Sequence, residues 1–250
     1  MDTQHLALVG LAAAAGGAVN AIAGGGSLIT FPSLVACGVP PVLASATNTV
    51  AMCPGYLGAT YAQRAELTGQ RVRIVKLLPA SAIGGAIGAL LLLHTDPSIF
   101  TFVVPFLLLA AILLLGFQDQ IKRRLHHVAS ESFAPIITGV AAIYGGYFGA
   151  GLGVIILAAL AVVIAESLTR LNALKQLISL VVNVTAAIVF LVIAPLDPVI
   201  TLTMACASLI GGVIGGRIAS KISAKALRYV VLAFGSIITI DYFAKLFGLL

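Results

Sequence analysis

The chain has 250 residues, of which 60% are hydrophobic and only 9% are charged, and its formal net charge is +6 at pH 7. Soluble domains carry about 25% charged residues, so this composition excludes a water-soluble globular domain. Apolar runs of the roughly 17–25 residues that a helix needs to cross a bilayer recur throughout. The composition therefore predicts a single polytopic membrane domain over residues 1–250. In such a protein an excess of basic residues reflects the orientation in the membrane, so nucleic acid is not an expected partner.

Ten helical segments are predicted, and a β-barrel is excluded because runs such as residues 100–117 are apolar on every face. In the first half the segments cover residues 5–23, 28–37, 43–62, 74–93 and 98–117. In the second half they cover residues 133–148, 154–165, 171–194, 198–219 and 226–247. A polar stretch at residues 118–132 separates the halves, and the second and seventh segments are short and follow glycine-rich breaks.

The two halves resemble each other in sequence. The stretch ASAIGGAIG at residues 80–88 recurs as ASLIGGVIG at residues 207–215, an offset of 127. Because a duplicated unit with five segments inserts upside down relative to its twin, we predict an all-α fold of two inverted-topology repeats. Repeat 1 covers residues 1–117 and repeat 2 covers residues 133–250. The glycines of the repeated stretch have the small-xxx-small spacing that allows helix backbones to pack closely.

The basic residues alternate from loop to loop. They gather in three stretches, at residues 64–76, 122–124 and 217–228, whereas the intervening turns carry Asp96 and Asp197 without Lys or Arg. By the positive-inside rule the three basic stretches, including the linker 118–132, are cytoplasmic and both termini lie outside. The acids Glu66, Glu131 and Glu166 are interpreted as solvated residues at loops or membrane boundaries.

The glycine breaks are the first candidate site. Short, glycine-interrupted segments at matching places in two halves are the best sequence pointer to a transporter's binding site. The N–H groups and helix dipoles that begin segments 2 and 7 favour anions; the alternative is a simple tight turn at the membrane surface. The candidate residues are Gly24, Gly25, Gly26 and Ser27 at the first break and Gly149 and Gly151 at the second.

Polar stripes on two helices form the second candidate site. On segment 8 the spacing places five polar residues on one face: Asn172, Lys175, Gln176, Ser179 and Asn183. A lysine inside the membrane usually faces a cavity or a partner, although Lys175 could instead snorkel to the headgroups and Asn183 could make an interhelical hydrogen bond. Segment 3 carries a similar uncharged stripe of Ser45, Asn48 and Thr49, and Asn20, before the first break, is a weaker candidate.

These motifs resemble the sulfite exporter TauE/SafE family of membrane permeases. The resemblance rests on AIAGGGSLITFPSLVACGVPPVLASATNTVAM in the first half, and on GGYFGAGLGVIILAAL, LNALKQLISLVVNVTAAIVFL and ASLIGGVIGGRIASKI in the second. It implies a permease that moves a small, often sulfur-containing anion such as sulfite or an organosulfonate across the bacterial inner membrane. The family motif positions carried over are Gly24, Gly25, Gly26, Gly149, Gly151, Asn172, Lys175 and Asn183, and Asn48 departs from the family's usual pattern.

The site residues are chemically suited to an anion. Lys175, the amides of Asn48, Asn172 and Asn183, and the helix N-termini all offer hydrogen-bond donors. We expect a secondary transporter that works by alternating access and exports its substrate. No enzyme activity, catalytic residue, metal or cofactor is expected, and the chain has no phosphate-binding GxxxxGK[ST] loop. The alternatives are an anion channel on the same fold and, less favoured, a membrane scaffold; a homo-oligomer is compatible with the sequence.

Overall fold

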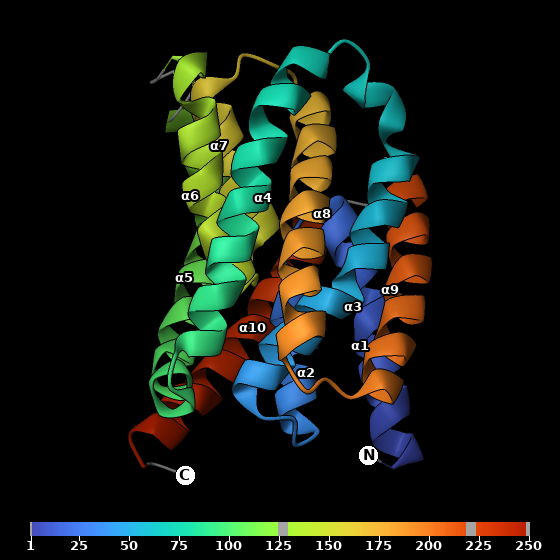
Figure 1. The fold of residues 1–250 in the computed structure, drawn as a ribbon, viewed down its shortest axis with the longest axis vertical. Helices are drawn as coiled ribbons and strands as arrows, with labels where there is room; N and C mark the ends of the chain where they lie inside the picture. Colours follow the sequence, from blue (N-terminus) through green and yellow to red (C-terminus); the bar gives the residue numbers. More distant parts are fainter. Residues whose placement is uncertain (1, 125–129, 219–223, 249–250) are drawn as a thin grey trace.

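The computed structural model describes residues 2–124, 130–218 and 224–248, and these residues form ten α-helices joined by short turns (Figure 1). In the first half the helices are α1 (Thr3–Ile22), α2 (Ser27–Ala36), α3 (Pro41–Ala62), α4 (Arg71–His94) and α5 (Pro97–Arg124). In the second half they are α6 (Ala134–Tyr147), α7 (Leu152–Val163), α8 (Leu168–Ile193), α9 (Pro198–Ile218) and α10 (Ala224–Leu246). Two short 3-10 helices, η1 (Arg64–Leu67) and η2 (Glu131–Phe133), precede α4 and α6.

Local sequence signals set the helix ends. Asp96 and Asp197 each precede a proline, and their carboxylates accept hydrogen bonds from the first-turn N–H groups of Ser98 and Val199 at 2.8 Å. These aspartates satisfy N–H groups that have no partner within the helix. Proline is favoured at the first helical position because its fixed φ angle suits the helix and it has no N–H to satisfy. The turns that contain Asp96 and Asp197, and no Lys or Arg, are therefore where α5 and α9 begin.

The ten predicted segments correspond to these ten helices, and the all-helical fold is confirmed. One prediction needs correction: residues 118–124, assigned to the polar linker, continue helix α5 to Arg124. Residues 125–129 of the linker, together with Ala219 and Lys221 of the basic stretch after α9, lie outside the described residues. Hydropathy marks where the apolar run stops, but Gln, Lys and Arg are good helix formers and extend the helix beyond it.

The helices pack as two similar groups. Helix α1 packs on α9 and α4 packs on α6, while α3 contacts α9 and α4 contacts α8. Helices α3 and α8 contact each other, as do α5 and α10. Each helix of the first half corresponds to one of the second half, α1 to α6 and so on to α5 and α10. Exchanging every helix for its counterpart leaves this set of pairings unchanged. In Figure 1, moreover, α3 and α8 run in opposite directions along the long axis of the molecule.

The glycines of the repeated stretch lie in the closest helix contacts. A methyl group on Gly88 of α4 would overlap the Ile143 carbonyl of α6, and one on Gly211 of α9 would overlap the Ala14 carbonyl of α1. Helix backbones approach this closely only where the side chain is a hydrogen atom. Each copy of the repeated sequence thus packs closely against a helix of the other half.

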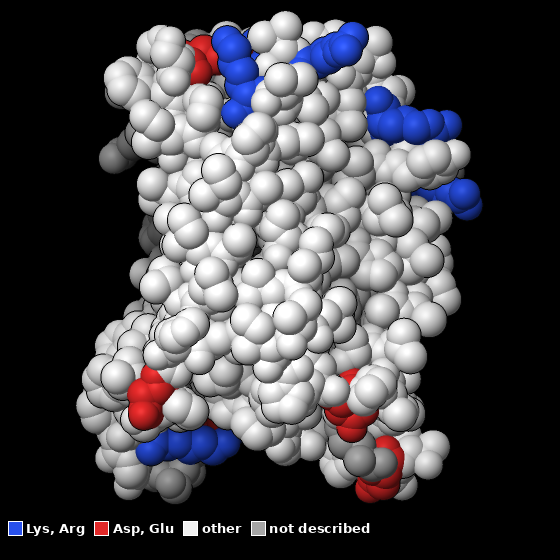
Figure 2. Space-filling view, viewed as in Figure 1, with Lys and Arg blue, Asp and Glu red and all other residues white. Residues whose placement is uncertain are grey.

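Six helices of the described chain are long and apolar enough to span a bilayer, namely α1, α4, α8, α9 and the apolar parts of α5 and α10. On the face shown in Figure 2, a broad uncharged band separates the two ends: most of the visible Lys and Arg lie toward the end where α3 joins α4, and most of the charged side chains at the other end are acidic. Both termini lie at that second end (Figure 1). The protein is a multi-pass membrane protein, as its composition predicted.

Candidate substrate site

The two glycine breaks meet inside the protein. Gly24 and Gly25 follow α1 with φ angles of 75° and 97°, and Gly149 and Gly151 follow α6, both with φ of 75°. These left-handed conformations favour glycine. The breaks are in contact, because a methyl group on Gly24 would lie only 3.4 Å from the carbonyl carbon of Gly153 at the start of α7. The alternative interpretation, a tight turn at the membrane surface, is wrong for the first break, where Gly24, Gly25, Gly26 and Ser27 are all buried.

The N-termini of two short helices therefore face one region. Helix α2 begins after Gly26 and α7 after Gly151, and neither start is capped by a side chain of its N-cap residue. The amide of Gly26 donates instead to the Asn20 side-chain oxygen at 2.6 Å. Helix N-termini carry a partial positive charge of about half an elementary charge. Two of them at one place create a positive potential in the interior.

Lys175 lies between the breaks. It is in the second turn of α8 and only 1% exposed, so it does not snorkel to the surface. Its methylene chain runs beside Gly153, whose added methyl group would lie 3.5 Å from the lysine Cδ. Its ammonium nitrogen lies 3.5 Å from the carbonyl oxygen of Asn20. The same carbonyl accepts a hydrogen bond at 3.0 Å from the amide of Gln176, which also donates to Ala21 at 3.0 Å.

The polar stripe of α3 lines the other side of the breaks. Asn48 accepts a hydrogen bond from Thr30 of α2, and the Ser45 hydroxyl lies 3.5 Å from the carbonyl oxygen of Phe148 at the second break. Thr49 donates to the Ser45 carbonyl at 3.0 Å, and its hydroxyl faces Gly149. All three α3 side chains are buried. The stripes of α3 and α8 thus contact the same pair of glycine breaks.

The α8 stripe does not act as one unit. Asn172, at the start of α8, donates to the side chain of Gln63 at the end of α3 at 2.7 Å, away from the breaks. Asn183, two turns beyond Lys175, is buried and donates to the Ser179 carbonyl of its own helix at 2.8 Å. The structure therefore groups Lys175 and Gln176 with Asn20 and the breaks and places Ser179 one turn further along α8. Asn172 is connected to the end of α1 only through Gln63.

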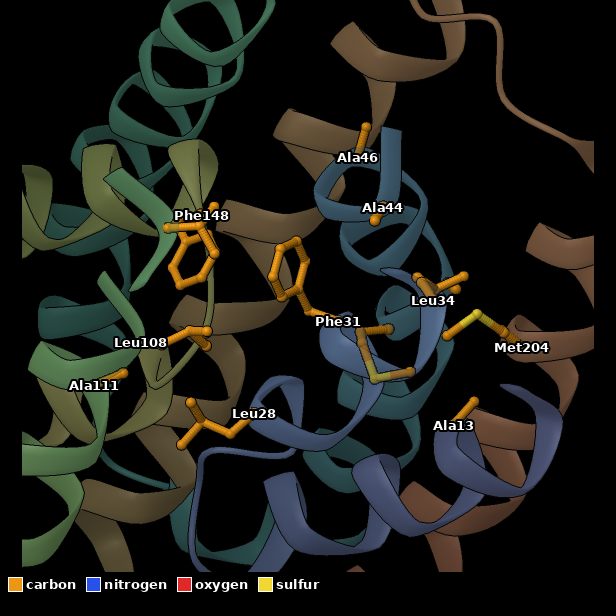
Figure 3. Close-up of a cluster of buried hydrophobic side chains, with 14 of the residues drawn as sticks. Ala13, Leu28, Phe31, Leu34, Ala44, Ala46, Leu108, Ala111, Phe148 and Met204 are labelled. Carbon is orange, nitrogen blue, oxygen red and sulfur yellow. The ribbon is translucent and has the colours of Figure 1, made fainter. Parts of the chain in front are cut away.

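An apolar group closes the site beyond the α3 stripe. Phe31 of α2 and Phe148 at the second break face each other edge to face, with ring centroids 5.1 Å apart (Figure 3). Phe100 of α5 packs against Phe148 at 6.1 Å. All three rings are fully buried or nearly so. The aromatic rings and the buried polar residues together describe a site that is closed to solvent in this conformation.

Three residues of the site were not predicted. Thr30 joins Asn48 to the first break, Gln63 joins Asn172 to the Ala21 carbonyl, and Gly153 makes room for both Gly24 and Lys175. Thr30 is four residues after Gly26, so its position on the first turn of a helix starting at the break was a usable signal. The role of Gln63 depends on which helices are neighbours, which one sequence does not reveal.

Comparison with known proteins agrees with this architecture. The family model described as "Sulfite exporter TauE/SafE" matches residues 8–242. The chain belongs to this family. The TauE/SafE match spans both halves and both glycine breaks, so it covers every candidate site residue. No solved structure matches the chain.

Curated relatives of this TauE/SafE protein are named as transporters. A "Probable membrane transporter protein" of Haemophilus influenzae is 29% identical over 228 residues, which cover 88% of each chain. "Probable membrane transporter protein ORF9" of a Sinorhizobium species is 29% identical over 89% of this chain and 86% of its own. "Probable membrane transporter protein YfcA" of Escherichia coli K12 is 25% identical over 89% and 84%. The protein is a membrane transporter of the TauE/SafE family.

Proposed function

We propose that this protein is a secondary transporter that carries a small sulfur-containing anion, such as sulfite or an organosulfonate, across the bacterial inner membrane. Transport proceeds by alternating access between two inverted repeats, residues 1–117 and 133–250, and its direction is export. The name of the family supports the sulfur-containing substrate, and the bacterial relatives support the membrane. No residue acts as a catalyst.

The observation that carries the proposal is the position of Lys175. The side-chain nitrogen of Lys175 and two positively polarised helix N-termini lie close together, and such a group attracts an anion. An anion held there gains three favourable interactions at once, because the ammonium group and both helix starts attract it. The same arrangement repels a cationic substrate.

The packing of the helices supports the inverted repeats. The main helix pairings have counterparts when the halves are exchanged, and α3 and α8, the central helices of the two halves, run in opposite directions. The site lies where the halves meet, as in other transporters built from inverted repeats. In the cell, the end of the molecule with the basic side chains faces the cytoplasm and both termini lie outside.

Substitution of Lys175 tests the proposed site. We expect Lys175→Met, which keeps the length of the side chain and removes its charge, to weaken sulfite binding by at least tenfold, measured with radiolabelled sulfite and purified protein. Lys245→Met is the matched control, because Lys245 is exposed at the end of α10 and pairs with Asp241 at 2.7 Å. Equal sulfite binding by wild type and a folded Lys175→Met variant would remove this lysine from the site.

A further inference from the structure

The amide group of Gln176 offers the site an acceptor, not a donor. Its nitrogen donates to two carbonyl oxygens at the end of α1, those of Asn20 and Ala21, both at 3.0 Å. Turning the amide over would bring its oxygen against these two carbonyl oxygens, so the orientation is fixed. Within the described residues the remaining atom, Oε1, is buried and has no hydrogen-bond partner. Gln176 therefore contributes a buried hydrogen-bond acceptor to the site.

A second unpartnered group lies one turn along the same helix. The hydroxyl of Ser179 is fully buried and, within the described chain, has no hydrogen-bond partner. Many helical hydroxyls in this protein bond to the carbonyl four residues earlier, as Ser81 does to Leu77 at 2.7 Å and Thr49 does to Ser45 at 3.0 Å, although Thr60 and Thr138 do not. Ser179 does not follow this pattern, and its hydroxyl both donates and accepts.

Both groups lie next to Lys175. The ammonium nitrogen of Lys175 and the amide nitrogen of Gln176 share the carbonyl oxygen of Asn20, at 3.5 and 3.0 Å. Ser179 is four residues after Lys175 and three after Gln176, so all three side chains project from one side of α8. Buried polar groups are expected to be hydrogen-bonded, and an unpaired acceptor costs about 1–3 kcal/mol. A ligand that reaches Lys175 is well placed to remove this cost.

We propose that the site selects small anions that carry a hydrogen-bond donor of their own, such as a protonated oxyanion or a hydroxyl- or amino-substituted sulfonate. The negative group of the ligand pairs with Lys175, and its O–H or N–H group donates to Gln176 Oε1, with Ser179 as the neighbouring partner. An anion that has only acceptor atoms leaves Gln176 unpaired. This inference rests on the proposed function and narrows its substrate class.

Two sulfonates of equal charge and similar size test the inference. 2-Hydroxyethanesulfonate and propane-1-sulfonate differ only in that a hydroxyl group replaces a methyl group. Their affinities are measured by calorimetry on the purified full-length protein. We expect the wild type to bind the hydroxyl compound about tenfold more tightly, because only this ligand satisfies the buried acceptor. Equal affinities would overturn the inference and leave the proposed function standing. Binding of neither compound would also overturn the inference, and the proposed function would be contradicted as well only if sulfite did not bind.

Substitutions of two residues test which side chains cause the preference for the hydroxyl-bearing sulfonate. Gln176→Met and Ser179→Ala are expected to reduce the tenfold preference for 2-hydroxyethanesulfonate over propane-1-sulfonate. Ser81→Ala is the matched control, since Ser81 is equally buried but lies on α4 with its hydroxyl already bonded. Because Gln176 also holds the end of α1, its variant is checked for folding by size-exclusion chromatography, and Ser179→Ala provides the test on its own. An unchanged preference in a folded variant would remove that residue from the selectivity site.

The pH dependence of binding distinguishes the two kinds of ligand named in the proposal, a protonated oxyanion and a sulfonate that carries a hydroxyl group. Sulfite loses its last proton near neutral pH, whereas the hydroxyl group of 2-hydroxyethanesulfonate stays protonated. If the donor is what the site recognises, affinity for sulfite falls as the pH rises through that titration and affinity for 2-hydroxyethanesulfonate falls less. Parallel pH profiles for the two ligands would contradict this mode of recognition.

Discussion

Single glycines decide how closely the helices of this protein approach. On α9, a methyl group at Gly211 would overlap the backbone of Ala14, whereas on α1 a methyl group at Gly10 would lie 3.4 Å from a side-chain methyl group of Thr203, an ordinary contact. Both positions belong to the same α1–α9 interface. Comparing alanine substitutions at Gly211 and Gly10 therefore separates the effect of pushing the two helices apart from the effect of adding one methyl group that fits.

We expect Gly211→Ala to lower stability by about 1–3 kcal/mol, the usual cost of overpacking a close interface. Gly10→Ala should change stability by less than about 0.5 kcal/mol. Both variants are compared with wild type by reversible unfolding in mixed micelles. Similar losses of stability in the two variants would mean that α1 and α9 are not packed as closely as the structure shows.

At the scale of residues, the sequence identified polar side chains that the structure buries, but not the partners that they contact. Lys175 and Gln176 were singled out because polar residues on one face of an apolar helix need a reason to be there. Spacing along a helix does not reveal the neighbouring helices, however. It did not show that Asn172 pairs with Gln63, or that the amide nitrogen of Gln176 is held by α1.

The contact between the two breaks links the starts of α2 and α7. Gly24 and Gly38 both have left-handed backbones, with φ of 75° and 86°, but only a methyl group on Gly24 would meet another part of the protein. Substitution by alanine costs about 1–2 kcal/mol of backbone strain at either position. At Gly24 the methyl group itself would make an ordinary contact with Gly153 at 3.4 Å, so any additional effect of Gly24→Ala comes from displacing the backbone where the two buried breaks meet.

We therefore expect Gly24→Ala to reduce sulfite transport strongly and Gly38→Ala to leave it near the wild-type rate. Sulfite uptake into vesicles, normalised to the amount of folded protein, provides the measurement. If the two variants lose activity equally, backbone strain alone explains the loss and the contact between the breaks has no role in transport.

A group of ion pairs ties the two halves together at the basic end of the molecule. Arg73 at the start of α4 pairs with Glu131 of η2 at 2.7 Å and with Glu166 before α8 at 2.8 Å. Arg170 pairs with the second oxygen of Glu166 at 3.2 Å. The hydrogen bonds from Arg73 lower the pKa of both Glu131 and Glu166. These two acids lie outside the α-helices and are partly exposed, as interpreted from the sequence, but they also form ion pairs.

These ion pairs predict acid sensitivity. Because the folded protein holds both carboxyl pKa values below their ordinary value of about 4.3, the pairs stabilise it above that pH and the stabilisation is lost as the pH falls through the lowered values. We expect the melting temperature of wild type to fall below pH 4.5 more steeply than that of Arg73→Gln. Arg71→Gln, an exposed charge in the same turn, is the control. Identical acid profiles for Arg73→Gln and wild type would contradict this role.

The elements themselves were largely predictable from sequence. Glycine and proline punctuate the apolar runs, so the ends of α2, α3 and α9 lie close to the predicted ones. The extension of α5 to Arg124 was missed because a helix leaving the membrane keeps its backbone pattern while its hydropathy changes. The partners of Arg73 were missed because they depend on the meeting of three loops from different parts of the chain.

At the scale of the whole molecule, the two halves enclose a buried, positively polarised site that is closed to solvent. In the proposed mechanism of alternating access, one repeat would move against the other and expose the site to each side in turn. A channel would need a continuous open path through the same residues. A carrier that works by alternating access and a channel differ in their transport kinetics with the same substrate, so transport measurements can tell them apart.

Counterflow of sulfite in proteoliposomes tests the central claim most directly. Vesicles loaded with unlabelled sulfite and diluted into labelled sulfite should accumulate label transiently, at a rate well above that of vesicles loaded with buffer, because a carrier returns faster with substrate bound. A rate equal to that of protein-free vesicles would contradict sulfite transport altogether. Rapid flux without any stimulation by internal sulfite would contradict alternating access and indicate a channel.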